Sequence, residues 1–272
     1  MRLTFDHLVH FVQRTPQEAS EQFCQAGFHA VAGGRHASWG TWNSLSYFGL
    51  SYVEFLAVER EELARQSDNP LVRRQCIEDK AKGEGFGQIA LRTNEMDAWA
   101  ERLRSQGLQV TGPVAGSRTR DDGTTLRWRM LFLEDADSAL LPPFLIEWSQ
   151  TDEERLEDLT NRGIIGAHPN GAAHLQSVGY AVKDLEEATA RWQSWFGWKK
   201  SAVFHDKELG AICQAFALPG GNVVLCQPTE EGLAQTALKN RGQRPFFARL
   251  AGASKNSEYK IGGGSYFLAA LE

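Results

Sequence analysis

The sequence lacks the features of a membrane, secreted or nucleic-acid-binding protein. No apolar run approaches the roughly 18 residues of a membrane span, and the first ten residues contain no apolar signal-peptide segment. The four cysteines among 272 residues show no CxxC spacing, which favours reduced thiols over disulfides. A net charge of −5 argues against general nucleic-acid binding. We therefore expect a cytoplasmic protein with a small-molecule substrate as its partner. The sequence leaves open whether it forms a homodimer.

What the sequence does contain is a repeat of long period. Three similar segments begin at His7, Gln88 and Ser177. In each, an apolar strand-like stretch leads through a helix-start signal into an amphipathic helix pattern. Each helix pattern stops at a glycine about 20 residues after the start of its segment, at Gly27, Gly107 and Gly197.

The repeating unit reads β-α-β-β-β, because segments rich in β-branched and aromatic residues follow each helix. This pattern predicts an α+β fold. The tail after Glu231 resembles a fourth unit that has lost much of its helix and turns. An acidic, polar stretch follows the second unit and predicts a linker at 153–171, between a pair of modules at 1–152 and the third and degenerate fourth modules at 172–272.

Two glutamates, Glu54 and Glu147, lie in the middle of apolar strand-like runs. A buried carboxylate is costly unless a partner neutralises it. His7 and Gln88 lie in upstream strands of the same units, and the four side chains supply one nitrogen and three oxygen donors. Such a set suits one divalent ion: Zn, Ni, Co, Mn or Fe. Two alternatives stay open, namely that the glutamates pair with nearby arginines and that His7 is a core histidine.

A β-α-β-β-β unit used in pairs resembles the glyoxalase / vicinal oxygen chelate superfamily, in which the first and last strands of each module hold a metal. Four motifs carry the resemblance: His7 in DHLVHFV, Glu54 in YVEFLAV, Gln88 in FGQIALRT and Glu147 in LIEWS. The stretch GGRHASWGTWNSLSYFG is similar to the glyoxalase-like domain branch. The resemblance implies the glyoxalase/bleomycin resistance/dihydroxybiphenyl dioxygenase-like fold, with repeated modules paired into cupped mixed β-sheets.

The resemblance further implies a metal-dependent lyase or isomerase that acts on a small substrate with vicinal oxygens through an enediolate-type intermediate. Glu147 would be the catalytic base, and His7, Glu54 and Gln88 would be the steadier ligands. Ser177 stands where the third module would have a ligand, so that module is expected to serve as scaffold or pocket wall.

Two groups of residues are candidates for substrate binding. Arg35, His36, Trp42 and Asn43 lie in a glycine-punctuated stretch that suits a mobile rim, although a solvated loop with packed tryptophans is an alternative. Strand alternation places Arg127 and Arg129 on one face, where they would hold a carboxylate or a thiol-conjugate anion. The alternative for these two is a charged solvent face.

Two rival functions remain. A binding or sequestering protein of the resistance type would hold a small molecule in the same cup without chemistry. A ring-cleaving dioxygenase is disfavoured, because such enzymes use two histidines and one carboxylate where this chain has Gln88.

Overall fold

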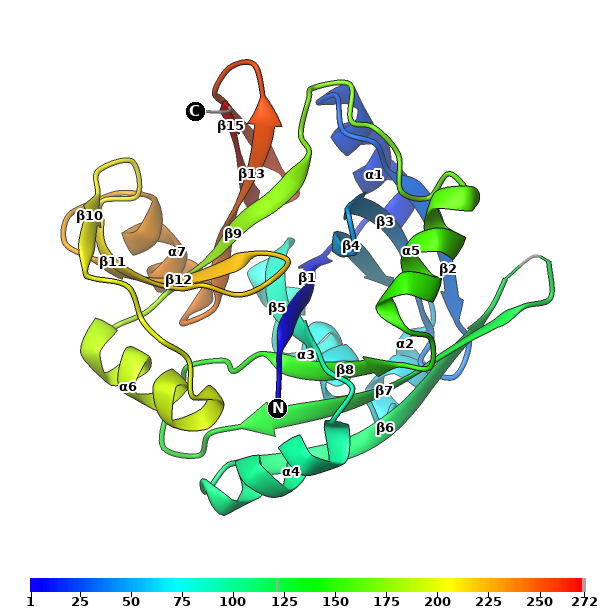
Figure 1. Cartoon of the computed structure of the whole chain (residues 1–272), viewed down its shortest axis with the longest axis horizontal. Helices are drawn as coiled ribbons and strands as arrows, with labels where there is room; N and C mark the ends of the chain where they lie inside the picture. Colours follow the sequence, from blue (N-terminus) through cyan, green and yellow to red (C-terminus); the bar gives the residue numbers. More distant parts are fainter. Residues whose placement is uncertain (121, 271–272) are drawn as a thin grey trace.

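Two curled mixed β-sheets, packed against each other, form the framework of the protein (Figure 1). The structure is a computed structural model that describes residues 1–120 and 122–270. Within these residues the first sheet has the strand order β2-β3-β4-β1-β5-β8-β7-β6, and the second has the order β10-β11-β12-β9-β13-β15-β14. The predicted α+β class and the cupped mixed sheets are confirmed.

The first sheet is built from two β-α-β-β-β modules. The first module comprises β1 (Thr4–Phe11), α1 (Pro16–Gln25), β2 (Val31–His36), β3 (Thr41–Phe48) and β4 (Ser51–Val58). The second comprises β5 (Gly85–Arg92), α4 (Met96–Ser105), β6 (Gln109–Thr119), β7 (Thr125–Glu134) and β8 (Phe144–Trp148). The first strand of each module pairs in parallel with its last strand, and β1 and β5 meet antiparallel at the centre of the sheet.

The first helix shows how local sequence fixes these elements. Thr15 caps α1 through a capping box with Glu18, which satisfies free N–H groups at the helix start. The apolar face of α1 includes Phe23, whose ring packs edge-on against Phe55 of β4. The helix therefore covers the face of the first module that points toward the second sheet.

Three short helices connect the two modules: α2 (Glu61–Gln66), α3 (Pro70–Ile77) and η1 (Lys80–Lys82). Asn69 caps α3, accepting hydrogen bonds from the backbone N–H groups of Leu71 and Val72. The side chains of Leu71 and Val72 join an apolar cluster in the cup of the first sheet.

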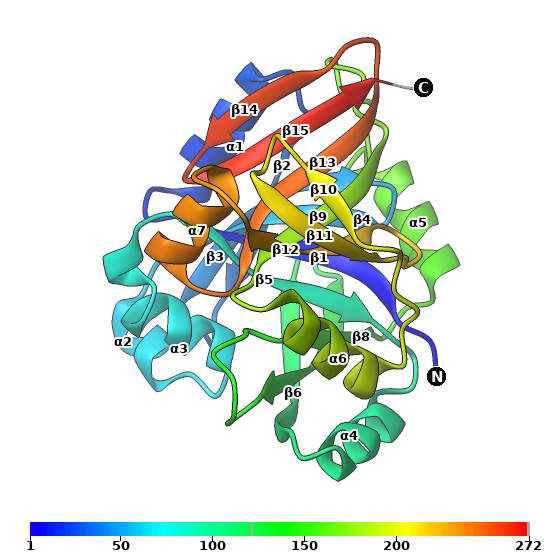
Figure 2. The same ribbon diagram turned by 90° about the vertical axis from the view of Figure 1, so that its left-hand side faces the viewer.

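The second sheet holds the third module and a reduced fourth (Figure 2). The third comprises β9 (His174–Ala181), α6 (Leu185–Phe196), β10 (Phe204–Asp206), β11 (Ala211–Phe216) and β12 (Asn222–Pro228). After α7 (Leu233–Arg241) come β13 (Pro245–Ala253), β14 (Ser257–Ile261) and β15 (Gly264–Ala270). Residues of α7 pack with Phe246, Phe247 and Phe267 into an apolar cluster on this sheet, so its face is filled with side chains.

The segment that we predicted as a linker is partly helical. Helix α5 (Asp152–Asn161) begins at a capping box formed by Thr151 and Glu154 and lies next to β2 and β3 in Figure 1. Its Arg155 reaches the buried Asp6 of β1 at 3.4 Å. The segment therefore contributes to the cup of the first sheet.

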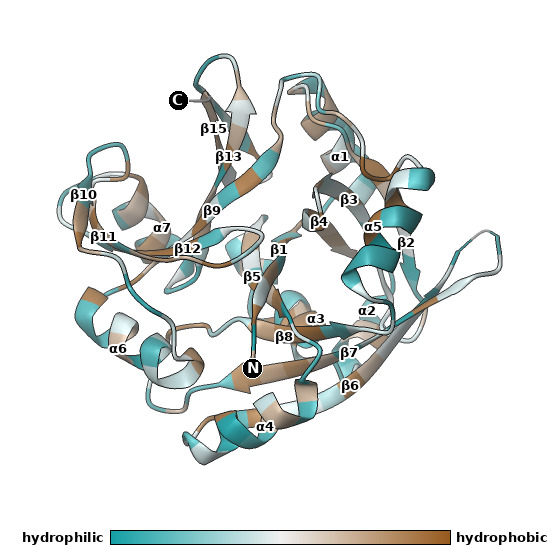
Figure 3. Cartoon of the chain, in the orientation of Figure 1, coloured by the Kyte–Doolittle hydropathy of each residue, from teal (hydrophilic) through white to brown (hydrophobic). Residues whose placement is uncertain are grey.

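One continuous core joins the two sheets, as the brown interior elements and teal helix faces of Figure 3 illustrate. His10 of β1 is fully buried within it; its ring nitrogens lie 2.6 Å from the Tyr266 hydroxyl and 2.6 Å from the Gly262 carbonyl oxygen. The turn at Gly220 also contacts the first sheet, because its carbonyl accepts a hydrogen bond from Ser51. Across the described residues, no helix is both long and apolar enough to span a membrane.

Candidate functional site

The cup of the first sheet contains a cavity of about 630 Å³. Its walls come from β1, β2, β3, β4, β6, β7 and β8, from α3 and from α5. One side is polar and includes His7, Asn43 and Glu54. Another part of the wall is apolar and includes Phe144 and Ile146. A cavity of this size, lined by both polar and apolar side chains, can hold a small-molecule ligand.

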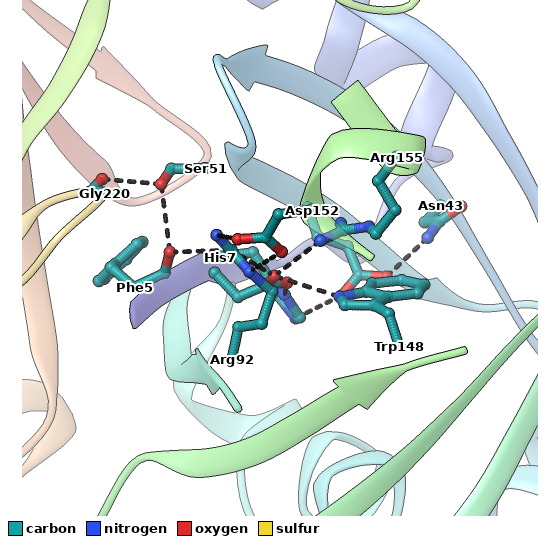
Figure 4. Close-up of polar contacts among 11 residues, drawn as sticks. Phe5, His7, Asn43, Ser51, Arg92, Trp148, Asp152, Arg155 and Gly220 are labelled. Carbon is teal, nitrogen blue, oxygen red and sulfur yellow. Dashed lines mark hydrogen bonds and ion pairs between the residues drawn. The ribbon is translucent and has the colours of Figure 1, made fainter. Parts of the chain in front are cut away.

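His7 is held in one orientation at the centre of the polar side. Its Nδ1 lies 2.7 Å from Asp6 Oδ1, and its Nε2 lies 3.6 Å from Glu54 Oε2 (Figure 4). The ring stacks on Tyr52 with 4.6 Å between centroids. Because the anionic Asp6 only accepts hydrogen bonds, Nδ1 carries the proton and Nε2 presents its lone pair to the cavity.

A β-bulge explains how two consecutive residues reach the same site. Neighbouring residues of a regular strand point to opposite faces. In the β1–β5 pairing, however, Phe5 faces Leu91 and His7 faces Ala90, so β1 carries Asp6 as an extra residue. The bulge turns Asp6 toward the ring of His7.

Two arginines neutralise the buried Asp6. Arg92 Nη1 lies 3.0 Å and Arg155 Nη1 3.4 Å from Asp6 Oδ2, and Trp148 Nε1 donates to the same oxygen at 3.2 Å. Burial alone would raise the pKa of Asp6, but Arg155, His7 and Arg92 together hold it below its ordinary value. Asp6 is therefore an anion at neutral pH.

Asn43 fixes the second carboxylate of the site. Its Nδ2 donates to Glu54 Oε1 at 2.6 Å, and its Oδ1 accepts the backbone N–H of Gly34 at 3.0 Å. A Cβ atom on Gly33 would lie only 2.0 Å from Asn43 Oδ1. Gly33 thus leaves the space that the amide needs, and Glu54 keeps Oε2 facing His7.

Neutral donors complete the polar side. Burial lowers the pKa of His36 to about 4, so this imidazole is neutral at physiological pH; its Nδ1 lies 3.0 Å from Thr41 Oγ1. Burial also raises the pKa of Tyr47 to about 12 and that of Tyr52 well above its ordinary value. Both hydroxyls remain protonated and are able to donate hydrogen bonds.

Two solved structures share this fold, and a third matches part of the chain. A hypothetical protein from Staphylococcus aureus superposes with a TM-score of 0.79 at 20% identity, covering 99% of this chain and 100% of that one. A mutant of 4-hydroxymandelate synthase from Streptomyces coelicolor gives 0.59 at 13% identity, covering 92% and 71%. A methylmalonyl-CoA epimerase variant from the same organism gives 0.42 at 19% identity, covering 55% and 100%. No curated protein sequence matches the chain.

The sequence model of the glyoxalase-like domain matches residues 5–196. The chain belongs to this family. The match extends from β1 through both modules of the first sheet and α5 to the end of α6. The resemblance seen in the sequence is therefore confirmed, and the metal site that it implies can be compared with the geometry of the cup.

The donor set of the cup does not fit the four-ligand metal site expected from the glyoxalase-like family. His7 and Glu54 come together as predicted. His36 lines the same cavity, but within the described part of the chain no group of three or more His, Cys, Asp or Glu side chains is arranged to hold an ion. Gln88 and Glu147, the other two predicted ligands, lie elsewhere.

The register of the strands explains why the second module supplies no ligand next to His7 and Glu54. In the first module His7 pairs with Tyr52, and Glu54 lies two residues further along. His7 also pairs with Ala90 of β5, and Ala90 pairs with Phe144 of β8. The positions of the second module that correspond to His7 and Glu54 are therefore Ala90 and Ile146.

Glu147 and Gln88 have other partners, so the predicted roles of metal ligand and base are not supported for them. Glu147 lies on the opposite face of β8, where it pairs with Arg129 and accepts the backbone N–H of Met96 at the start of α4. The alternative of an arginine-paired glutamate describes it correctly. The amide of Gln88 accepts from Arg74 at 3.1 Å and donates to the Pro142 carbonyl.

Of the four predicted substrate-binding residues of the first module, three line the cavity and one does not. His36 and Asn43 line the cavity, as does Arg35, whose guanidinium also pairs with Glu59 at 2.8 Å. Trp42 packs instead against the core between the sheets.

The predicted arginine pair lies outside the cavity. Arg127 and Arg129 share a face, as expected, but this is the outer face of β7. Arg118 of β6, opposite Leu126, lines the cavity in their place. Asp6 and Arg118 are the site residues that sequence reasoning missed. An acidic residue beside the candidate ligand His7 was the available signal for Asp6.

Proposed function

We propose that this glyoxalase-like protein is an acid–base enzyme, an isomerase or lyase that moves a proton at a carbon next to a carbonyl group, with His7 as the base. The supporting observation is the Asp6–His7–Glu54 arrangement at the cavity wall. A positioned imidazole whose second nitrogen is hydrogen-bonded to a buried carboxylate is a recurrent form of general base.

Two carboxylates flank the imidazole of His7. When Nε2 takes a proton, the imidazolium lies between Asp6 at 2.7 Å and Glu54 at 3.6 Å. Glu54 is then able to receive the proton and return it to another atom of the substrate. The hydroxyls of Tyr47 and Tyr52 donate toward the negative charge that develops on the substrate oxygens. The side chains that act in this route, Asp6, His7, Tyr47, Tyr52 and Glu54, all belong to the first module.

The test is solvent exchange of carbon-bound hydrogen. Purified protein is incubated in deuterium oxide with a panel of 2-oxo acids and 2-oxoaldehyde–thiol adducts, and deuterium incorporation is followed by NMR. His7→Asn keeps a hydrogen bond to Asp6 but removes the base, so we expect a loss of about 100- to 10,000-fold in rate. Cavity tryptophan fluorescence reports whether the variant still binds ligand.

Each result bears on one mechanism. Wild-type exchange that survives treatment with a chelator supports the proposal. Exchange that stops with the chelator and returns with a divalent ion would favour a metal-dependent lyase or isomerase with an enediolate-type intermediate. An exchange rate unchanged in His7→Asn would remove His7 from the mechanism. Tight ligand binding without exchange of any substrate would favour a sequestering protein, the second candidate, which the extensive apolar wall suits.

A further inference from the structure

Among the arginines that line the cavity, Arg118 is the one for which the described residues provide no acidic partner. Arg120 pairs with Asp158, Arg162 with Asp122 and Asp158, Arg155 with Asp6, and Arg35 with Glu59. In residues 1–120 and 122–270, no carboxylate lies within ion-pair distance of Arg118. Its half-buried guanidinium thus lines the cavity without an ion pair to any described carboxylate.

The backbone around Arg118 makes room for this placement. Arg118 pairs with Leu126 across the β6–β7 hairpin, so both side chains point to the cavity face. A Cβ atom on Gly34 would lie 2.7 Å from Cδ of Arg118. Gly34 in β2 thus lets the arginine stem pass close to the strand. The two consecutive glycines of this strand therefore position Asn43 and Arg118 respectively.

Burial makes an unpaired guanidinium costly. Burial lowers the pKa of Arg118, and Tyr47, Tyr52 and Glu54 are near enough to influence it. Arginine nevertheless stays protonated in proteins, so the cation is retained at the wall of the cavity. A partly desolvated cation gains most from an anion that fills the space in front of it.

The wall contributed by β7 and β8 of the second module is apolar. It consists of aromatic and aliphatic side chains: Trp128, Met130, Phe144, Ile146 and Trp148. Trp128 packs against Trp148 at 5.5 Å between centroids and against Trp39 at 6.1 Å. Gly116 permits this, because a Cβ there would lie 2.3 Å from Trp128 Nε1. The ligand of this cavity must therefore match one cation and an extended apolar surface.

We propose that the cavity binds an amphipathic monocarboxylate, with its carboxylate on Arg118 and its aromatic or branched aliphatic part against the apolar wall. A single negative charge fits better than a phosphate dianion, because Glu54 shares the cavity and repels a second charge. The planar guanidinium also matches the two oxygens of a carboxylate. The proposal names the substrate class of the site described above, and it rests on the proposed function only in calling this ligand a substrate.

Binding is tested with 3-phenylpropionate, followed by quenching of the cavity tryptophans and by calorimetry. We expect saturable binding to the wild type. The neutral isostere 3-phenylpropanamide, acetate and inorganic phosphate should each bind at least about tenfold more weakly, because each lacks either the single charge or the apolar part. Equal affinity for 3-phenylpropanamide, acetate or inorganic phosphate would overturn the proposal, as would the absence of 3-phenylpropionate binding.

Variants of Arg118 test whether this residue binds the carboxylate of the ligand. Arg118→Met should raise the Kd for 3-phenylpropionate by about tenfold or more, the usual effect of losing a charged hydrogen-bonded partner. Arg118→Lys keeps the positive charge and serves as a second variant in case Arg118→Met does not fold. Its affinity should be intermediate, because an ammonium group cannot bind a carboxylate bidentately. Arg127→Met is the matched control: it removes one exposed charge from the outer face of the same hairpin and should leave Kd unchanged. Wild-type affinity in both Arg118 variants would overturn the assignment.

The two proposals fail in different ways. Binding that depends on Arg118 without any hydrogen exchange would refute the proton-transfer function and keep the carboxylate site. Exchange of neutral carbonyl compounds that Arg118→Met does not slow would keep the function and refute the substrate class.

Discussion

Two buried histidines should make the protein acid-sensitive well above the pH at which carboxylates titrate. Burial lowers the pKa of His10 to about 4, with Glu84 and the Gly262 carbonyl only partly opposing it, and burial lowers the pKa of His36 to about 4. An unfolded histidine has a pKa near 6.5. As the pH falls from about 6.5 to 4, the unfolded state therefore binds protons that the folded state refuses, and stability is lost.

The magnitude follows from the size of the shifts. A depression of about 2.5 units corresponds to roughly 3 kcal/mol for each histidine once the pH has fallen to about 4. Together the two would remove about 6 kcal/mol, a large part of the ordinary 5–15 kcal/mol stability of a folded domain. Between about pH 5.5 and 6, where carboxylates contribute little, each histidine should add about 1 kcal/mol per pH unit to the slope.

Urea unfolding at several pH values measures this slope. His10→Asn should be less stable at neutral pH, because it loses the contacts to Tyr266 and Gly262, but its slope should fall by about 1 kcal/mol per pH unit relative to the wild type. Tyr266→Phe is the control: it removes the same hydroxyl contact and leaves the imidazole, so the wild-type slope should persist. An unchanged slope in His10→Asn would refute the assignment of the acid sensitivity to this buried group.

Two further predictions concern the site. Glu147→Gln should leave the rate of hydrogen exchange within about twofold of wild type. It should lower the free energy of unfolding by about 1 kcal/mol or less, since it weakens a partly exposed ion pair with Arg129 outside the cavity. Loss of exchange in a variant that still binds ligand fully would instead identify Glu147 as a base. Gly33→Ala should displace the amide of Asn43 and slow hydrogen exchange about tenfold or more. Its effect should not add to that of Asn43→Ala in the double variant, because both substitutions break the same hydrogen bond to Glu54. Additive effects would show that Gly33 acts elsewhere.

The repeat could be predicted from the sequence because its signals are local. The capping box at Thr15 and the cap at Asp184 act within one helical turn, and both are present in the structure. The apolar periodicity of each helix follows from the one face that it buries. Local signals of this kind do not depend on how strands pair, so the modules could be recognised before their arrangement was known.

The second half of the site could not be predicted, because it depends on which face each residue of β5 and β8 occupies. Both faces of β8 are covered over most of its length, so its sequence is apolar apart from Glu147 and shows no alternation. Glu147 therefore appeared to be equivalent to Glu54, although the register assigns that role to Ile146. A shift of one residue reverses the face of a strand side chain.

Bulges add to the difficulty. The pairing of β1 with β5 contains a second irregularity, in which one residue of β1 lies opposite two residues of β5, Gly87 and Gln88. Each of the two irregularities shifts the pairing of β1 with β5 by one residue, so counting along a regular strand does not give the partner of His7. Asp6 was missed for the related reason that a regular strand would have turned it away from His7. Only the pairing of the strands reveals either shift.

The first module supplies buried acidic residues to the candidate site that the second module does not match. Because Ala90 and Ile146 supply no polar group, nothing from the equivalent positions of the second module can neutralise Glu54 and Asp6. The compensating charges come instead from Arg92 at the end of β5 and from Arg155 of α5, a helix outside the repeated unit. The segment after the paired modules is thus required for the electrostatics of the first module. Removing α5 should impair the orientation of His7 even though every residue of both modules would remain.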